Sequence, residues 1–313
     1  MKIVLSRKGF DSSNGHIPSP IFQQEDGTLS LYSLPIPKKQ ATYRYSDIQW
    51  NQSNLQVLIS SLRRGKKTRP DYPAHLDPDL VRDAVKNRHP DWCPIFGQSG
   101  SSETQLQHER VNDLAEDGCG RPLFLYFGWY REVKSMPAGY SYVKKAPNIH
   151  ALFGWLQVER KIVLRDRERR EEVRSEFPWA AHHPHVADDY DDAPNAIYIA
   201  PKPGSKADRL ILNGRDTGLP AAGMFRRFDP EVHTLTAKDR SRSRWCLPSW
   251  FYRDGDPKLG MHKKKSRWEV QSDPRNIHLQ SVGKGQEFVL DSGDYDEKQI
   301  GKWVERIVRA GQR

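Results

Sequence analysis

Hydrophobic residues in this chain gather in short runs that are separated by polar loops. The chain opens with one such run, Ile3-Val4-Leu5, and a longer aliphatic and aromatic run covers residues 123–129. Short apolar runs rich in β-branched and aromatic residues are typical of buried strands. The same pattern predicts further strands over residues 151–158, 162–164, 195–200, 210–212 and 288–290.

Turn and helix signals occupy the segments between these strands. Asp26-Gly27, between apolar residues at 21–22 and 29–34, predicts a hairpin with a tight turn. Apolar faces over residues 55–62 and 297–310 predict two helices. Further helices are expected over residues 79–86, where Pro78 suits a first turn, over 103–115 and over the mixed-charge stretch 165–176, while residues 131–148 and 180–185 are expected to be irregular.

Strands at both ends of the chain, with helices between them, predict a mixed α+β fold with a central mixed sheet and flanking helices. A length of 313 residues permits one elaborated domain or two. Because distinctive segments occur at both ends of the chain, we expect a single domain over residues 1–313.

Positive charge exceeds negative charge, and the excess is clustered. Lys and Arg number 50 against 40 Asp and Glu, and residues 238–267 alone carry ten cations against three anions. Residues 63–69 carry five cations and no acid. Clustering of this kind favours a polyanionic partner over general solubility.

Other classes of protein are disfavoured. The sequence has no apolar run of about 18 residues and no signal-peptide pattern, so we expect a cytoplasmic protein without a membrane partner. Cys93, Cys119 and Cys246 are too far apart to suggest a zinc pair or a disulfide framework. The glycine patterns of phosphate loops, dinucleotide-binding folds and α/β-hydrolases are missing from the sequence.

A polar loop follows the first predicted strand. Its side chains combine two cations, a carboxylate and small hydrogen-bonding groups, which suit an anionic sugar-phosphate and a positioned water. An ordinary solvated turn is the alternative. The residues are Ser6, Arg7, Lys8, Asp11, Ser12, Ser13 and Asn14.

Several segments together carry a family resemblance. They are the N-terminal stretch 2–37, Leu123-Phe124-Leu125-Tyr126-Phe127-Gly128-Trp129, residues 151–158, His183-Pro184-His185-Val186, residues 247–251 and Gly285-Gln286-Glu287-Phe288. With these segments the chain resembles a bacterial and phage family described as nucleotide-modification-associated domains of the third type. The resemblance implies a DNA or nucleotide context, and it suggests phage-defence DNA glycosylases acting on glycosylated hydroxymethylcytosine.

Asp11 and Glu287 lie in two of these segments and are the predicted catalytic pair. Cleavage of an N-glycosidic bond passes through a cation-like sugar, which an anion stabilises while water is aligned. Gln286, beside Glu287, is a predicted substrate-binding residue. The alternative is that each acid caps a turn or a helix.

Histidines cluster at residues 182–185, close to Asp188. A metal site needs three or four converging ligands, and neighbouring residues on an extended loop point to opposite sides. His183 and His185, which are two residues apart, are therefore predicted to contact substrate. We expect neither a metal nor another cofactor.

Residues 238–268 form what we call the basic aromatic segment. Cations neutralise phosphates, and aromatic rings stack on exposed bases or replace a flipped base. A solvated loop with core tryptophans is the alternative. The predicted DNA contacts are Arg240, Arg242, Arg244, Trp245, Trp250, Lys263, Lys264, Lys265 and Arg267.

These observations lead to the hypothesis of a glycosylase-type enzyme that excises a hypermodified base from double-stranded DNA in defence against phages. No obligate protein partner is evident. The alternatives are a transferase that builds or elaborates a modified base, and a non-catalytic reader of modified DNA.

Overall fold

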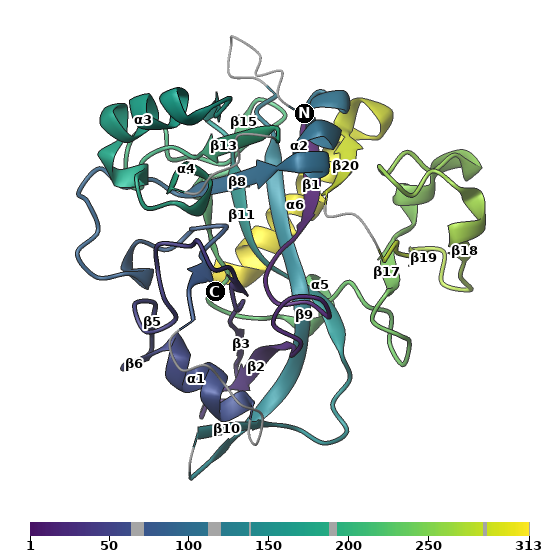
Figure 1. Ribbon diagram of the computed structural model, residues 1–313. Helices are drawn as coiled ribbons and strands as arrows, with labels where there is room; N and C mark the ends of the chain where they lie inside the picture. Colours follow the sequence, from purple (N-terminus) through teal and green to yellow (C-terminus); the bar gives the residue numbers. More distant parts are fainter. Residues whose placement is uncertain (64–71, 112–119, 138, 188–192, 284–286, 313) are drawn as a thin grey trace.

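A computed structural model describes residues 1–313 except 64–71, 112–119, 138, 188–192, 284–286 and 313. Its main sheet runs in the order β16 (Ala222–Met224), β11 (Ile149–Gln157), β9 (Leu123–Met136), β1 (Lys2–Arg7) and β20 (Glu287–Asp291). Strand β9 extends through much of the length of the molecule (Figure 1). Its first six residues, 123–128, are all buried, as the apolar run predicts.

The N-terminal chain pairs with β9 twice. Strand β1 runs parallel to β9 from Ile3 to Arg7, and β2 (Ser19–Gln23) resumes parallel pairing opposite Tyr130. Between them the chain leaves the sheet at Lys8, whose N–H still donates to Phe127 O at 2.8 Å. The polar loop therefore emerges beside the middle of β9.

Strand β20 covers the other edge of β1 and runs antiparallel to it. The register places Ser6 opposite Glu287, two residues separated by 281 positions in sequence. This pairing brings the last predicted strand next to the polar loop.

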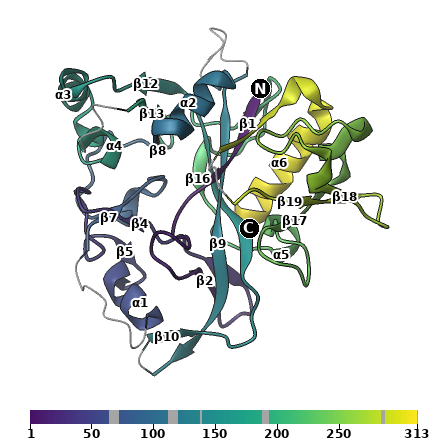
Figure 2. The same cartoon turned by 45° about the vertical axis from the view of Figure 1, so that its right-hand side comes forward.

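A second sheet lies on one side of the main sheet (Figure 2). It has the order β12 (Arg160–Val163), β13 (Asn195–Ile199) and β8 (Ile95–Ser99). Three helices accompany it: α2 (Gly100–His108), α3 (Arg167–Glu176) and α4 (Pro184–Ala187). Strand β8 leads directly into α2, so the carboxyl end of the strand and the first turn of the helix form one corner.

A third sheet stands on the opposite side of the main sheet (Figures 1 and 2). It consists of β17 (Arg244–Pro248), β19 (Asn276–Gln280) and β18 (Trp268–Val270), and it contains part of the basic aromatic segment. The C-terminal helix α6 (Glu297–Gln312) buries Ile300, Val304 and Ile307. These residues belong to the same hydrophobic cluster as Ile3 and Leu5 of β1.

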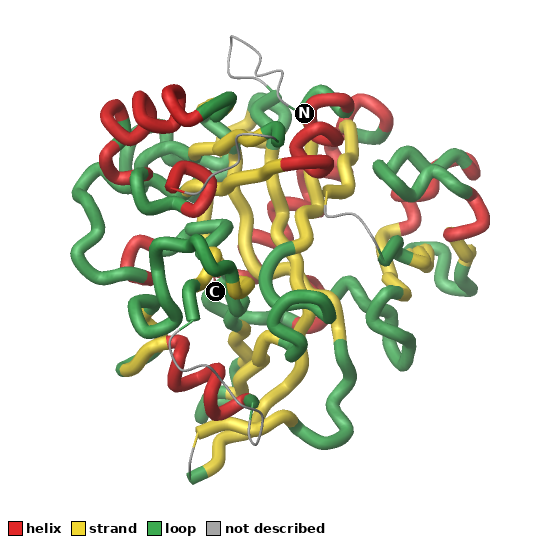
Figure 3. The backbone as a smooth tube through the Cα atoms, in the orientation of Figure 1, coloured by secondary structure: helices red, strands yellow, loops and turns green. Residues whose placement is uncertain are grey.

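The remaining helices and strands are short and are joined by extensive loops (Figure 3). They are β3 (Leu29–Leu31), β4 (Ile36–Pro37), β5 (Gln49–Trp50), β6 (Ser53–Asn54), α1 (Leu55–Leu62), β7 (Ala74–His75), β10 (Gly139–Tyr142), β14 (Ile211–Leu212), β15 (Arg215–Asp216), α5 (Pro230–His233) and 3₁₀ turns at Arg82–Ala84, Pro178–Ala180, Ser249–Gly255, Lys265–Arg267 and Ser292–Asp294.

The mixed α+β class is confirmed, and so are the hairpin at Asp26-Gly27 and the helices α1, α3 and α6. Three local predictions are wrong. Residues 79–86 contain only the 3₁₀ turn Arg82–Ala84 in place of a helix. Residues 131–136 continue β9 and pair with β10, and residues 184–185, which were expected to be irregular, begin helix α4. Helix α2 begins before the predicted start and ends at His108, and residues 112–115 lie outside the described chain.

The confirmed elements have apolar or turn patterns in their own sequence. The end of β9 and strand β10, by contrast, contain few apolar residues, and they are held as strands by pairing with each other. No described helix has the length and apolar character needed to cross a bilayer. The prediction of one domain over residues 1–313 stays a prediction.

Candidate functional site

A polar cavity of about 500 Å³ opens where the N-terminal loop meets the corner between β8 and α2. Six separate parts of the chain supply its walls. The lining residues are Arg7, Lys8, Gly9, Asp11, Asn14, Ile36, Lys38, His75, Asp77, Gln98, Ser99, Gly100, Ser101, Ser102, His185 and Gly283.

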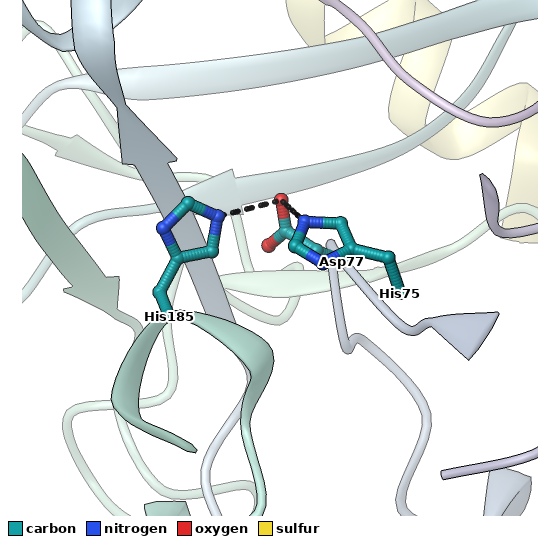
Figure 4. Close-up of side chains that lie close together, drawn as sticks. All are labelled: His75, Asp77 and His185. Carbon is teal, nitrogen blue, oxygen red and sulfur yellow. Dashed lines mark ion pairs between the residues drawn. The ribbon is translucent and has the colours of Figure 1, made fainter. Parts of the chain in front are cut away.

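Asp77 lies at the centre of a buried charged cluster in this wall. The Gly97 N–H donates to Asp77 Oδ1 at 2.7 Å, and His183 Nε2 lies 3.4 Å from the same oxygen. The other oxygen, Oδ2, faces His75 Nε2 and His185 Nε2, each 3.9 Å away (Figure 4). Lys8 Nζ lies 4.0 Å from Oδ2.

The surroundings keep Asp77 ionised and two histidines neutral. Burial acts to raise the pKa of Asp77, but His183 and the charge of Lys8 hold that pKa far below its usual range. Burial lowers the pKa of His185 to about 3 and that of His75 well below its ordinary value. A carboxylate anion with neutral imidazoles beside it therefore faces the cavity.

Gly97 and Asn195 fix the position of His185. The Asn195 side-chain amide donates to the backbone carbonyl of His185 at 2.9 Å, which turns its Oδ1 toward His185 Nδ1 at 2.8 Å. A Cβ on Gly97 would lie only 2.3 Å from the His185 ring. A glycine at this place in β8 thus lets the imidazole pack directly on the strand.

Replacing Gly97 by Ala should lower the free energy of unfolding by about 1–3 kcal/mol, because the methyl group must displace the His185 ring. Urea denaturation measures the change. Gly283→Ala is the matched control, since a Cβ there meets no atom within 4 Å. Equal stability of the two variants would show that the His185 ring does not pack closely on Gly97.

Glu287, a predicted catalytic residue, is completely buried behind the cavity wall. Its Oε1 accepts hydrogen bonds from Ser6 Oγ at 3.0 Å and from the Gln98 amide, and it lies 3.5 Å from Lys8 Nζ. Burial raises its pKa, against the opposing charge of Lys8. Glu287 is not among the lining residues, but Lys8 and Gln98, which it contacts, are.

Asp11, the other predicted catalytic residue, lines the cavity but holds a turn. Its Oδ1 accepts the N–H groups of Ser13 at 2.7 Å and Asn14 at 2.6 Å. No hydrogen bond or ion pair joins Asp11 to Glu287, although the structure describes both residues. Asp11 thus caps a turn, which is the alternative that the sequence analysis left open. Its catalytic role stays a prediction.

The other predicted substrate-binding residues are divided among several environments. Arg7, Lys8, Asn14 and His185 line the cavity, and His183 is buried beside Asp77. Arg7 donates to the carbonyls of Val282 and Gly283 at 3.0 and 2.9 Å. Ser6 is fully buried, Ser12 and Ser13 are exposed outside the cavity lining, and Gln286 lies outside the described residues.

The basic aromatic segment divides into exposed cations and buried rings. Trp245 has no exposed surface and donates from Nε1 to His150 Nδ1 at 3.0 Å, so we correct the expectation that its ring contacts DNA. Trp250, half-buried, stacks on Phe251 with ring centroids 4.2 Å apart. The tryptophans serve mainly the core, as the alternative interpretation expected.

The cations of this segment differ in how far they are exposed and in whether they already pair with other groups of the protein. Lys263, Lys264, Lys265 and Arg240 are exposed, while Arg244 is paired with Glu269. Arg267 is half-buried and donates to Gln280 O at 3.2 Å.

Arg242 connects the segment with the cavity rim. Its guanidinium lies over the Trp129 ring, 4.3 Å from the centroid. Burial lowers the pKa of Arg242, and the negative charge of nearby Asp11 opposes this shift. At this residue the basic aromatic segment comes near Asp11, one of the residues that line the cavity.

Sequence reasoning missed His75 and Asp77, which join the histidine cluster from a distant segment. A signal was available: residues two apart on an extended chain point to the same side, and His75-Leu76-Asp77 has this spacing. The predicted exclusion of a metal considered only residues 182–188, and it did not include these two groups.

The polar cavity combines a buried carboxylate, imidazoles and cations, which makes it the candidate functional site among the described residues. The sequence matches the family of nucleotide modification associated domain 3 over residues 2–291. The chain belongs to this family, which confirms the resemblance and associates the protein with nucleotide modification. Searches among curated proteins and among solved structures find no match.

Proposed function

We propose that this protein is an enzyme that hydrolyses the N-glycosidic bond of a modified nucleotide in DNA. The observation that carries the proposal is Asp77: a carboxylate held ionised inside a polar cavity with cations at its rim. Family membership supports a nucleotide as the substrate. In cells, the reaction would act against phages whose genomes carry such bases.

The chemistry needs an anion close to the reacting sugar. As the bond between base and sugar breaks, positive charge develops on the sugar, and a preorganised carboxylate in a water-poor site stabilises it strongly. Asp77 meets this requirement better than Asp11, whose Oδ1 is used by two backbone N–H groups. The buried carboxylate of Glu287 pairs with Lys8 and holds the ammonium group of Lys8 beside Asp77.

The size and the charge of the cavity suit one flipped nucleotide. Its volume of about 500 Å³ falls in the range of small-molecule sites. Arg7, Lys8 and Lys38 line it together with Ser101 and Ser102 in the first turn of α2. Cations and the start of a helix both favour phosphate, and enzymes that act on a base in a duplex first flip it out.

The same phosphate-binding features favour a second candidate function. A transferase that elaborates a base would use Arg7, Lys8 and the first turn of α2 to hold the phosphate of a donor. The two functions differ in their products. Hydrolysis releases a free base and leaves an abasic site, whereas transfer produces a heavier nucleoside.

Incubation of the purified protein with DNA that carries glycosylated hydroxymethylcytosine tests the proposal. We expect a released base, measured by mass spectrometry, and alkali-labile sites in the DNA strand. DNA of the same sequence with unmodified cytosine is the control. Modified DNA that is bound but stays intact would reject excision and favour a reader, and a heavier nucleoside after donor addition would favour the transferase.

A further inference from the structure

Three side chains of metal-ligating type converge at the cavity wall. His75, Asp77 and His185 are all buried, and one ligand atom from each lies within 4.8 Å of the others. Figure 4 shows both imidazole rings turned toward the Asp77 carboxylate. His75 ends β7, Asp77 follows it by two residues and His185 lies in α4, so only the folded chain brings the three together.

The hydrogen bonds around His185 prepare one nitrogen as a ligand. Because the Asn195 amide group donates to the His185 carbonyl, its oxygen faces Nδ1, and Nδ1 must carry the proton of that hydrogen bond. In the neutral ring the lone pair then lies on Nε2, the atom that faces Asp77. Metal-bound histidines are oriented in this way, with the other ring nitrogen donating to an oxygen.

Asp77 is prepared in the same manner. Gly97 donates to Oδ1, while Oδ2 faces His75 Nε2 and His185 Nε2 at 3.9 Å each. Nitrogen and oxygen ligands about 2.0–2.2 Å from a tetrahedral ion lie roughly 3.4 Å apart. Each of these two separations is about half an ångström longer than that value, and the imidazole nitrogens lie within 4.8 Å of each other, so all three side chains would move inward around an ion.

We propose that His75, Asp77 and His185 bind a divalent transition-metal ion, of the zinc or iron(II) type, whose remaining coordination positions face the cavity. Two imidazoles and one carboxylate form a recurring ligand set for these ions. Three protein ligands leave positions for water or substrate, as in catalytic rather than structural sites. All three residues line the cavity.

The neighbouring groups accommodate an added positive charge. Lys8 Nζ lies 4.0 Å from Asp77 Oδ2, but it also lies 3.5 Å from Glu287 Oε1, so its charge is shared by two carboxylates. His183 is 4% exposed: its Nε2 lies 3.4 Å from Asp77 Oδ1, while its Nδ1 has no hydrogen-bond partner among the described residues. A buried ring nitrogen without a partner costs stability, so a polar group beside the three ligands is left unsatisfied.

Metal binding does not depend on which reaction the protein catalyses. Its consequence for chemistry does rest on the proposed function: when bound, such an ion would lower the pKa of a coordinated water and supply the nucleophile for hydrolysis, and Asp77 would then act as its ligand instead of as the anion beside the sugar. The inference departs from the sequence-based expectation of no metal and no cofactor.

Metal uptake by the full chain, purified without a histidine tag and stripped with a chelator, tests the inference. Titration with Co²⁺, Zn²⁺ and Fe²⁺ should load about one ion per chain, measured by elemental mass spectrometry, and Co²⁺ should give the visible absorption of a bound ion. His185→Gln should weaken binding at least tenfold, since loss of even an outer partner of a ligand costs about 10–100-fold.

His182→Gln is the matched control, because His182 is exposed next to the cluster and should leave metal binding unchanged. Thermal melts establish that each variant is folded, and His75→Gln replaces His185→Gln if the latter does not fold. A folded wild-type chain that binds none of the three ions at micromolar concentration overturns the inference. Metal binding without base release rejects the proposed reaction alone, and base release by the metal-free protein rejects the metal's part alone.

Discussion

Replacing Asp77 by Asn should slow base release by about a thousandfold, because the amide removes the anion that stabilises the developing positive charge. Asn has nearly the same shape and can still accept the Gly97 N–H. The ammonium of Lys8 keeps Glu287 as its partner. Single-turnover release of the base from modified DNA measures the effect, and a thermal melt shows whether the variant is folded.

Asp91→Asn is the control for this substitution. Asp91 is exposed in a loop, where it pairs with Lys202 at 2.6 Å, so its loss should leave the rate unchanged. If a folded Asp77→Asn protein kept a rate within a few-fold of the wild type, the cavity carboxylate would have no part in the chemistry. The search for the catalytic anion would then return to Asp11 and Glu287.

Replacing Lys263, Lys264 and Lys265 together by Ala should weaken binding to every DNA sequence by about a hundredfold at 0.15 M salt. Each phosphate contact on a duplex contributes about 0.9 to the slope of log affinity against log salt, so the slope should fall by up to about 2.7. The three side chains are exposed, they precede β18 of the third sheet, and they are not among the residues that line the cavity. Fluorescence anisotropy over a range of salt concentrations measures both quantities.

A second triple variant, which loses the same charge on another part of the protein, distinguishes the loss of phosphate contacts from a general effect of net charge. Arg165, Arg167 and Arg169 lie in or next to α3, where two of them pair with Glu171 and Glu172. Changing these three to Ala should alter the salt slope much less than the lysine change. The DNA path along the basic aromatic segment would be wrong if both triple variants bound with the same affinity and slope.

The sequence by itself determined the elements whose signals are local. Apolar runs defined β1, the first half of β9 and β20, and a helical apolar face defined α6, because burial of one face requires a matching period of side chains. Local charge clustering likewise indicated the exposed Lys263–Lys265 run. The family-bearing segments contained Lys8, His183, His185 and Glu287, all of which the fold brings to or behind one cavity.

The tertiary structure decided which of these residues meet, and in what environment. Asp77 joins His185 and Lys8 only because β8 and β13 pair across a long separation in sequence and the chain after β7 packs against them. Trp245 looked available to DNA in the sequence but is covered by Phe127 and His150. Contacts between distant segments depend on strand pairing and core packing, which leave no period or spacing in the chain, so the carboxylate at the centre of the site appeared only in the folded protein.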